Sequence, residues 1–458
     1  MTDLVESSSF RDPSGFLFTH NHRIYRRINY SYSEQYNRLM KSGLYEKLTA
    51  DNLLIPHTET NIESKYSDGA YKILVPEPIS FISYPYEWCF SQLKDAALTT
   101  LRIQKTALEY DMILKDSSAY NIQFHNGKPL LIDTLSFEIY REGYPWVAYR
   151  QFCQHFLAPL TLMALKDVRL NQMLQIYIDG MPLDLASKLL PISSWMQFAS
   201  ISHIHLHAKT QRYYQSKSPN RQKYKMKRLS LLGLMDNLET AVKKLKWKPS
   251  GTEWSKYYDD INYSSDAFNE KVEIIQMYLN KVSPRNVWDL GGNIGLFSRL
   301  ASNIGIPTIS LDNDPAAVEL NYQQTVRDKE INILPLLIDL TNPSSGIGWQ
   351  NNERVSLNDR GPADTVMALA LIHHLCISNN VPFNQLAEFF RSLCSTLIIE
   401  FIPKIDSQVQ RLLKTRDDIF TGYTEMNFRE EFEKLFNIVD RSSINESDRS
   451  LYLLKAKK

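Results

Sequence analysis

The sequence lacks a strong net charge, a paired cysteine motif and a long apolar run. Its formal charge at pH 7 is only +1, which gives no general attraction to nucleic acid or to an anionic membrane. The four cysteines are widely spaced and form no zinc-binding or redox pair, so we expect buried free thiols and no metal site. No segment reaches the roughly 20 apolar residues that span a bilayer, and no basic region followed by an apolar one begins the chain, so we expect a cytoplasmic protein without a membrane partner.

Length and composition indicate a globular chain of two domains. Its 458 residues exceed the roughly 250–300 at which a single hydrophobic core stops growing. Hydrophobic residues make up 43% of the chain, which is enough to form a core in each domain. We predict an α+β domain over residues 1–200, a basic helical linker over 201–254 and an α/β domain over 255–458.

The most informative stretch is residues 287–298, where a short apolar strand runs into a glycine-rich turn and then into a helix. Asp289 lies at the end of the strand, and Gly291, Gly292 and Gly295 follow it. In such a turn the backbone N–H groups and the helix N-terminus face a ligand, which predicts a site for a nucleotide-like cofactor. Dinucleotide enzymes and S-adenosylmethionine (SAM) enzymes both use this architecture, so the glycines alone do not distinguish them.

Four further strands are predicted in the same half of the chain, over residues 306–312, 333–339, 363–372 and 395–401. The first of these ends in Asp312, which is well placed to hold ribose hydroxyls, and the second ends in Asp339, which could accept a hydrogen bond from an adenine amino group. The third ends at His373 and His374. The fourth carries Glu400 near its end.

This strand order, with Asp289-x-Gly291-x-Asn293-x-Gly295, resembles the class I SAM-dependent methyltransferases over residues 255–458. The resemblance implies a Rossmann-like seven-stranded sheet whose final antiparallel pair, at 436–440 and 449–454, is lacking in a purely NAD-binding sheet. It also implies that SAM is held by Asp289, Gly291, Gly292, Asn293, Gly295, Asp312, Asn313, Asp339, Leu340 and Ala370. Asn293 replaces the usual middle glycine, a version similar to O-methyltransferase families that act on sugars and small molecules.

The same sheet edge contains the candidate catalytic residues. An enzyme that uses SAM must align a nucleophile with the methyl carbon and exclude water. A hydroxyl acceptor must also lose a proton, and a histidine suits that role near neutral pH. The resemblance places His373 and His374 toward the substrate, and Glu400 on the same edge would orient it. The alternative is that the histidines pack, or bond a backbone carbonyl, and do no chemistry.

The N-terminal half contains a second, shorter resemblance. Candidate strands at 23–28 and 70–75 lead into a helix of about 20 residues at 90–108. Beyond this helix, Asp116 is followed five positions later by an asparagine, and a hairpin then returns to Asp133. The spacing resembles the catalytic loop and metal-binding strand of protein-kinase-like phosphotransferases.

That resemblance implies that Asp116 is the catalytic aspartate, that Asn121 and Asp133 ligate a metal, that Lys72 pairs with phosphate, and that Mg-ATP is a ligand. The sequence departs from the pattern, because no His-Arg precedes Asp116, no Phe-Gly follows Asp133 and no glycine-rich loop is recognisable. The alternative is that Asp116 and Asn121 cap a turn and that Asp133 ends a strand. We expect Asp116, Asn121 and Asp133 to converge on one small cleft.

Residues 209–248 are strongly basic, with Tyr213, Tyr214 and Tyr224 interleaved. Basic residues with aromatics can grip a nucleic-acid backbone and stack bases. A solvated linker helix over residues 229–242 with basic ends gives the same composition, and we favour it.

Three histidines, His203, His205 and His207, alternate along the chain just before this basic stretch. Alternating histidines can ligate a metal if they share one face of a strand. No Cys or carboxylate lies immediately beside them to complete a set, so we favour surface or capping histidines.

The function predicted from these motifs is SAM-dependent methyl transfer to an oxygen of a small molecule or glycan. Two alternatives stay open: an RNA methyltransferase that uses the basic linker, and a bifunctional protein with a kinase-like domain. Recognition of the acceptor falls to loops without an independent signature, of which the polar insertion 348–361 suits a substrate-side loop.

Overall fold

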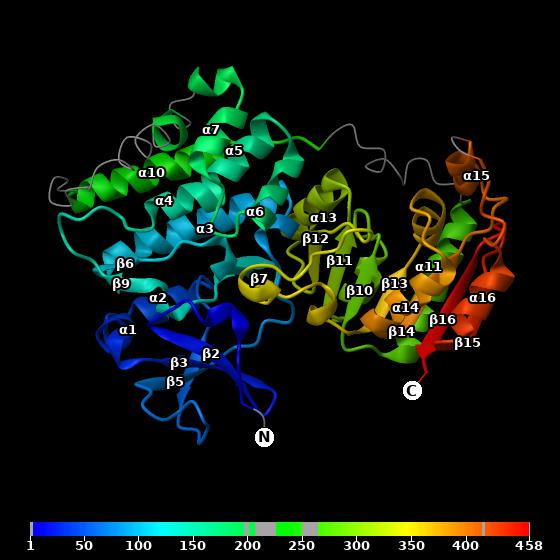
Figure 1. Ribbon diagram of the computed structural model, residues 1–458, viewed down its shortest axis with the longest axis horizontal. Helices are drawn as coiled ribbons and strands as arrows, with labels where there is room; N and C mark the ends of the chain where they lie inside the picture. The colour runs from blue at the N-terminus through cyan, green and yellow to red at the C-terminus, as the bar shows by residue number, and fades with distance from the viewer. Residues whose placement is uncertain (1–2, 197–200, 207–225, 250–263, 415–416, 458) are drawn as a thin grey trace. The chain divides into compact units, whose positions relative to one another are not determined.

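The computed structural model describes residues 3–196, 201–206, 226–249, 264–414 and 417–457. The chain forms two compact units, coloured from blue to green and from green to red in Figure 1. The N-terminal unit comprises Met1–Lys248 together with the segment Gly346–Val355. The C-terminal unit comprises Pro249–Ser345 and Ser356–Lys458.

The N-terminal unit begins with a five-stranded antiparallel sheet of order β1-β2-β3-β5-β4. Its strands are β1 Leu4–Val5, β2 Gly15–His20, β3 Arg23–Ile28, β4 His57–Thr60 and β5 Lys72–Pro76, and the helices α1 Ser33–Lys41 and α2 Leu44–Ala50 lie between β3 and β4 in the chain. Both strands predicted here, at 23–28 and 70–75, are present as β3 and β5. Asn21 and His22 have positive φ angles, the conformation that a two-residue hairpin turn requires between twisted strands.

The rest of the N-terminal unit is mainly helical and is built on α3 Phe90–Glu109, the long helix predicted at 90–108. Two short antiparallel ribbons follow it, one pairing β6 with β9 and one pairing β7 with β8. The remaining elements are β6 Met112–Leu114, β7 Ile122–His125, β8 Lys128–Leu131, β9 Phe137–Ile139, α4 Tyr149–Phe152, α5 Ala158–Leu165, α6 Met173–Ile176, α7 Leu183–Leu189 and α10 Arg228–Lys244.

Helix α10 packs against α3, and Figure 1 shows the two helices side by side. Leu231, Met235 and Leu238 on α10 are fully buried. Lys105 of α3 forms ion pairs with two carboxylates of α10. The predicted amphipathic helix over 229–242 is therefore confirmed, but it is not a solvated linker. An amphipathic pattern shows that one face is buried but not which neighbour buries it.

The segment Gly346–Val355 lies between β12 and β13 in the chain but belongs to the N-terminal unit. The Glu353 carboxylate accepts hydrogen bonds from the Arg11 guanidinium at 2.8 and 2.9 Å and is almost fully buried. The Val355 N–H donates to the Tyr84 hydroxyl at 2.9 Å. Most of the insertion that we expected to be a substrate-side loop is thus held by the N-terminal unit.

The C-terminal unit is a seven-stranded sheet of order β12-β11-β10-β13-β14-β16-β15. Strands β10 to β14 are parallel, and β16 runs antiparallel between β14 and β15. All seven predicted strands are present. The elements are α11 Ser265–Val282, β10 Val287–Leu290, α12 Ser298–Ser302, β11 Thr308–Asp312, α13 Pro315–Asp328, β12 Ile333–Leu337, β13 Ala363–Ala368, α14 Phe383–Leu393, β14 Cys394–Phe401, α15 Ser407–Leu413, α16 Glu425–Glu433, β15 Phe436–Ser443 and β16 Ser450–Ala456.

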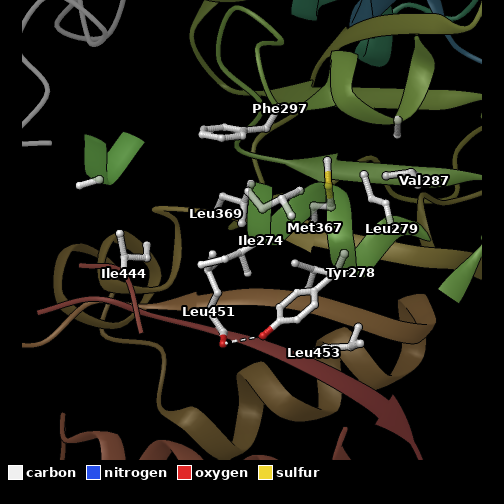
Figure 2. Packing of buried hydrophobic residues seen from close by; sticks show 14 residues of the cluster. Ile274, Tyr278, Leu279, Val287, Phe297, Met367, Leu369, Ile444, Leu451 and Leu453 are labelled. Carbon is white, nitrogen blue, oxygen red and sulfur yellow. Dashed lines mark hydrogen bonds between the residues drawn. The ribbon is translucent and has the colours of Figure 1, made fainter. Parts of the chain in front are cut away.

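Helix α11 closes a hydrophobic core against one face of this sheet, as Figure 2 shows. Ile274, Tyr278 and Leu279 of α11 pack with Met367 and Leu453 of the strands. The Tyr278 hydroxyl donates a hydrogen bond to the Ser442 hydroxyl at 2.9 Å, so this polar group is not left unpaired beside the apolar core. This packing fixes the helix on the sheet and determines where the residues of its first turns lie.

Two properties expected from composition can be compared with the described part of the chain. All four cysteines are buried free thiols, as predicted. No helix in the described ranges is long and apolar enough to cross a membrane.

We predict that Leu238→Ala destabilises the protein by about 2–4 kcal/mol, because truncating a fully buried leucine leaves a cavity between α10 and α3. Leu229 lies on the same helix but is 80% exposed, so Leu229→Ala should change stability by less than about 0.5 kcal/mol. Urea unfolding of both variants measures the difference. Equal effects would show that α10 is not packed in solution.

Candidate active site

A cavity of about 330 Å³ lies at the carboxyl ends of β10 to β13, the edge where open α/β sheets bind ligands. Every residue predicted from the sequence to hold the cofactor lines this cavity, with the exception of Gly295. A Cβ atom at Gly295 would lie 2.4 Å from the Asn321 side chain. Gly295 therefore permits close packing beside the turn and does not face the ligand space.

The turn after β10 has a backbone that few residues other than glycine tolerate. Gly291 has a φ of 77°, and a Cβ atom at Gly292 would lie 2.4 Å from the Ser310 hydroxyl oxygen. Asn293 also has a positive φ, of 50°. Asparagine is the residue that tolerates this conformation best after glycine, so Asn293 can replace the usual glycine without opening the turn.

Three carboxylates lie at successive strand ends along the cavity. Asp289 at β10 is buried and accepts a hydrogen bond from the Ser298 hydroxyl at 2.6 Å. Asp312 at β11 accepts the Asn293 N–H at 2.8 Å. Asp339, which follows β12, is exposed. Burial raises the pKa of Asp289 to about 6 and that of Asp312 to about 6.

The other end of the cavity is more apolar and contains one of the two predicted catalytic histidines. His374 lines the cavity, whereas His373 is 1% exposed and does not. The ring centroids are 4.0 Å apart, and neither nitrogen of His373 has a hydrogen-bond partner among the described residues. Burial, followed by the positive charge of Arg449, lowers the pKa of His374 to about 4, so this imidazole is neutral at physiological pH.

Glu400 does not lie where the sequence reasoning expected it. Its side chain is fully buried and does not line the cavity. The carboxylate accepts hydrogen bonds from Lys271 Nζ and from the Ala370 N–H, each at 2.7 Å. Glu400 is therefore part of the cavity wall and does not orient a substrate directly, while Lys271, which lines the cavity, was not identified from the sequence.

The three candidate residues of the N-terminal unit do converge. The Ser136 hydroxyl donates to Asp133 at 2.6 Å and accepts from the Asn121 amide at 3.4 Å. Burial raises the pKa of Asp116, which is also close enough to Asp133 to be affected by its charge and to Asn121 to accept its hydrogen bond. The turn-capping alternative also holds in part, because Asp133 accepts the Leu135 N–H at 3.2 Å.

A cation is already present at this cluster, and it is not Lys72. Arg26 of β3 donates one N–H group to Asp133 at 2.8 Å and one to Asp12 at 2.9 Å. Lys72 instead forms an ion pair with Glu59 on the neighbouring strand and is 40% exposed. The assignment of Lys72 as the phosphate-pairing lysine stays a prediction. Its strand was predicted correctly, but the direction of its side chain could not be.

The described histidines of the alternating set are buried, which contradicts our preference for surface or capping positions. His203 hydrogen-bonds with the Tyr149 hydroxyl at 2.6 Å and with the Asn237 side chain at 2.7 Å. His205 is stacked on Trp195 and bonded to two serine hydroxyls. His207 and residues 209–225 of the basic stretch, including Tyr213, Tyr214 and Tyr224, lie outside the described residues. Within the described ranges, no group of three or more His, Cys, Asp or Glu side chains could hold a metal ion.

Comparison with curated proteins gives a relative of nearly the same length. Nodulation protein NoeA from Rhizobium meliloti (strain 1021) is 31% identical over 455 residues, which cover 97% of this chain and 95% of that protein. The chain belongs to the NoeA family. No family model matches the sequence.

Solved structures match this member of the NoeA family at low TM-scores. Magnesium protoporphyrin IX methyltransferase (ChlM) from Synechocystis PCC 6803, crystallised with SAH, is 18% identical, with 44% of this chain and 92% of that chain covered and a TM-score of 0.33. WbdD is 17% identical, with 47% and 46% covered and a TM-score of 0.30. The N-methyltransferase NodS from Bradyrhizobium japonicum WM9 is 11% identical, with 43% and 99% covered and a TM-score of 0.30.

We predict that affinity for S-adenosylhomocysteine (SAH) is full above about pH 7 and about tenfold weaker at pH 5. Ribose hydroxyls donate hydrogen bonds, so they require the ionised form of Asp312, whose pKa is raised to about 6. Asp289 titrates in the same range and the two carboxyls interact, so the transition belongs to the pair. Calorimetry between pH 5 and 8 measures it. Asp312→Asn should bind weakly with a flattened profile, and an affinity independent of pH in the wild type would contradict the role of Asp312.

Proposed function

We propose that the C-terminal unit transfers the methyl group of SAM to a hydroxyl oxygen of a small molecule or glycan. The observation that carries this proposal is the cavity at the carboxyl edge, where a glycine turn and three carboxylates follow one another in the order of the strands. Backbone that approaches a ligand closely and acids that accept from hydroxyl and amino groups fit an adenosine.

In this proposal each part of the cofactor lies beside a different strand end. Asp339 follows β12 at one end of the cavity and would accept from the adenine amino group. Asp312 at the neighbouring β11 would accept from the ribose hydroxyls, and the turn from Gly291 to Asn293 would lie against the methionine portion. SAM supplies a methyl group on a positively charged sulfur, which is already a good leaving group.

The residues of this chain then have to position the acceptor, exclude water and take its proton. Phe268, Phe297 and Leu375 add apolar surface to the lining of the cavity. His374 also lines the cavity, and because its pKa is about 4 its imidazole is uncharged at neutral pH. Such a weak base takes a proton only as the new C–O bond forms and acidifies the hydroxyl. His373 lies behind His374 and would fix its ring.

We expect the full chain to transfer label from methyl-labelled SAM into a pool of small molecules and glycans. His374→Ala should lower this transfer by about 100-fold or more, as removal of a general base does, and leave the SAH affinity unchanged because His374 lies at the acceptor end. Scintillation counting of separated products and calorimetry measure the two effects. Unchanged transfer in His374→Ala would return the residue to a packing role.

The RNA methyltransferase alternative is tested by the same assay with a tRNA pool. Label that enters RNA and not small molecules would replace our proposed acceptor class. Binding to RNA would then fall steeply with salt, because contacts to phosphates release counterions.

For the N-terminal unit we propose a kinase-like scaffold that needs no nucleotide. Arg26 supplies to Asp133 the positive charge that a metal ion would supply in a working phosphotransferase. The second oxygen of Asp133 accepts from Ser136, so each carboxylate oxygen has a donor from within the unit. This fits a structural role for the unit and not a bifunctional enzyme.

We predict that Mg-ATP does not change the thermal unfolding midpoint of the wild type. Arg26→Ala should destabilise the protein by about 1–3 kcal/mol, because two carboxylates lose a charged hydrogen-bond donor. Arg23→Ala, an exposed position on the same strand, serves as the control and should have little effect. Scanning calorimetry with and without Mg-ATP gives both results, and a rise in the wild-type midpoint with Mg-ATP would contradict the scaffold.

A further inference from the structure

Lys271 is a buried cation in the wall of the cofactor cavity. It lies on α11, and its side chain is only 2% exposed. Its Nζ atom lies 2.7 Å from the Glu400 carboxylate and 4.7 Å from the centroid of the Phe297 ring. A lysine so deeply buried is rare, and burial lowers its pKa, so retaining the charge has a cost. The position of Lys271 in the cavity wall indicates which ligand group its positive charge could bind.

The order of the strands places Lys271 at the end of the cavity away from the adenosine. Asp339 and Asp312 follow β12 and β11, whereas Lys271 contacts the same carboxylate oxygen that accepts the Ala370 N–H just beyond β13. Between them, at β10, lies Asp289. A cofactor lying along the edge with its adenine beside β12 would therefore reach Lys271 with its methionine portion.

The charges at this end match that portion of the molecule. The methionine part of SAM and the homocysteine part of SAH each carry one ammonium and one carboxylate. The cavity wall here offers one carboxylate, on Asp289, and one ammonium, on Lys271, and the two are close enough for their charges to interact. An ion pair in a buried site is strongest when both partners are held in place beforehand.

We propose that Lys271 binds the amino-acid carboxylate of the cofactor and that Glu400 is a positioning residue that holds the lysine in the cavity wall. This inference rests on the proposed methyltransferase function. If Lys271 served only to neutralise Glu400, its contribution would be independent of any ligand, and an uncharged pair of similar volume would replace the two residues without loss of binding.

The test compares two ligands by calorimetry on the full-length chain: SAH, and decarboxylated SAH, which keeps the amino group. The wild type should bind SAH about tenfold to 100-fold more tightly, the range expected for a hydrogen bond between two charged groups. The double variant Lys271→Met/Glu400→Gln removes both charges, so no carboxylate is left buried alone, and it should bind the two ligands equally. Lys281→Met, on the same helix but 45% exposed and paired with Asp440, is the matched control and should keep the wild-type preference.

The outcomes separate this inference from the function on which it rests. A double variant that keeps the full preference for SAH overturns the role of Lys271 while the methyltransferase proposal stands. Equal binding of the two ligands by the wild type does the same and does not depend on the variant folding. A wild type that binds neither ligand overturns both proposals together.

Discussion

The C-terminal site depends on the buried carboxylate of Glu400. A carboxylate taken out of water costs several kcal/mol unless charged and hydrogen-bonded partners surround it. Lys271 reaches it from α11 and the Ala370 N–H from the end of β13, while Arg449 lies 3.8 Å away. These hydrogen bonds connect helix α11 and the end of strand β13 to Glu400 on strand β14. Ala370 has a φ of 49°, which is unfavourable for alanine, and the hydrogen bond to Glu400 stabilises that conformation at a position that lines the cavity.

The same group of charges affects the protonation state of His374. Arg449 bonds to Asp406, which also caps the N-terminus of α15, so its guanidinium is fixed in the wall. Its positive charge disfavours a second positive charge on the imidazole of His374 and adds to the effect of burial. Burial and the charge of Arg449, both properties of the cavity wall, thus keep His374 neutral. A positively charged cofactor would act in the same direction.

The sequence was sufficient for features that depend on neighbours along the chain. Each of the three cavity carboxylates follows its own strand, and parallel strands bring their carboxyl ends to one edge, so the sequence alone was enough to group Asp289, Asp312 and Asp339. Lys271 and Arg26 could not. Lys271 is 129 positions from Glu400 and Arg26 is 107 positions from Asp133, and no local pattern encodes such a pairing. Helix α10 is an intermediate case, because its apolar stripe was readable and its partner α3 was not.

Two clusters of acids in this protein differ in how their charge is compensated, and the difference bears on where chemistry can occur. In the N-terminal unit, Asp133 is paired with the guanidinium of Arg26 at 2.8 Å, so its charge is already balanced by a group of the fold. In the C-terminal cavity, burial raises the pKa of Asp312 to about 6, so its ionised form is held at a cost. A ligand that donates hydrogen bonds recovers that cost at Asp312, whereas at Asp133 it would first have to displace an arginine. A carboxylate whose charge is unfavourable in an empty cavity favours ligand binding, whereas a carboxylate already paired with a cation favours the stability of the fold. This difference supports the proposed division of roles, with ligand chemistry in the C-terminal unit and structural support in the N-terminal unit.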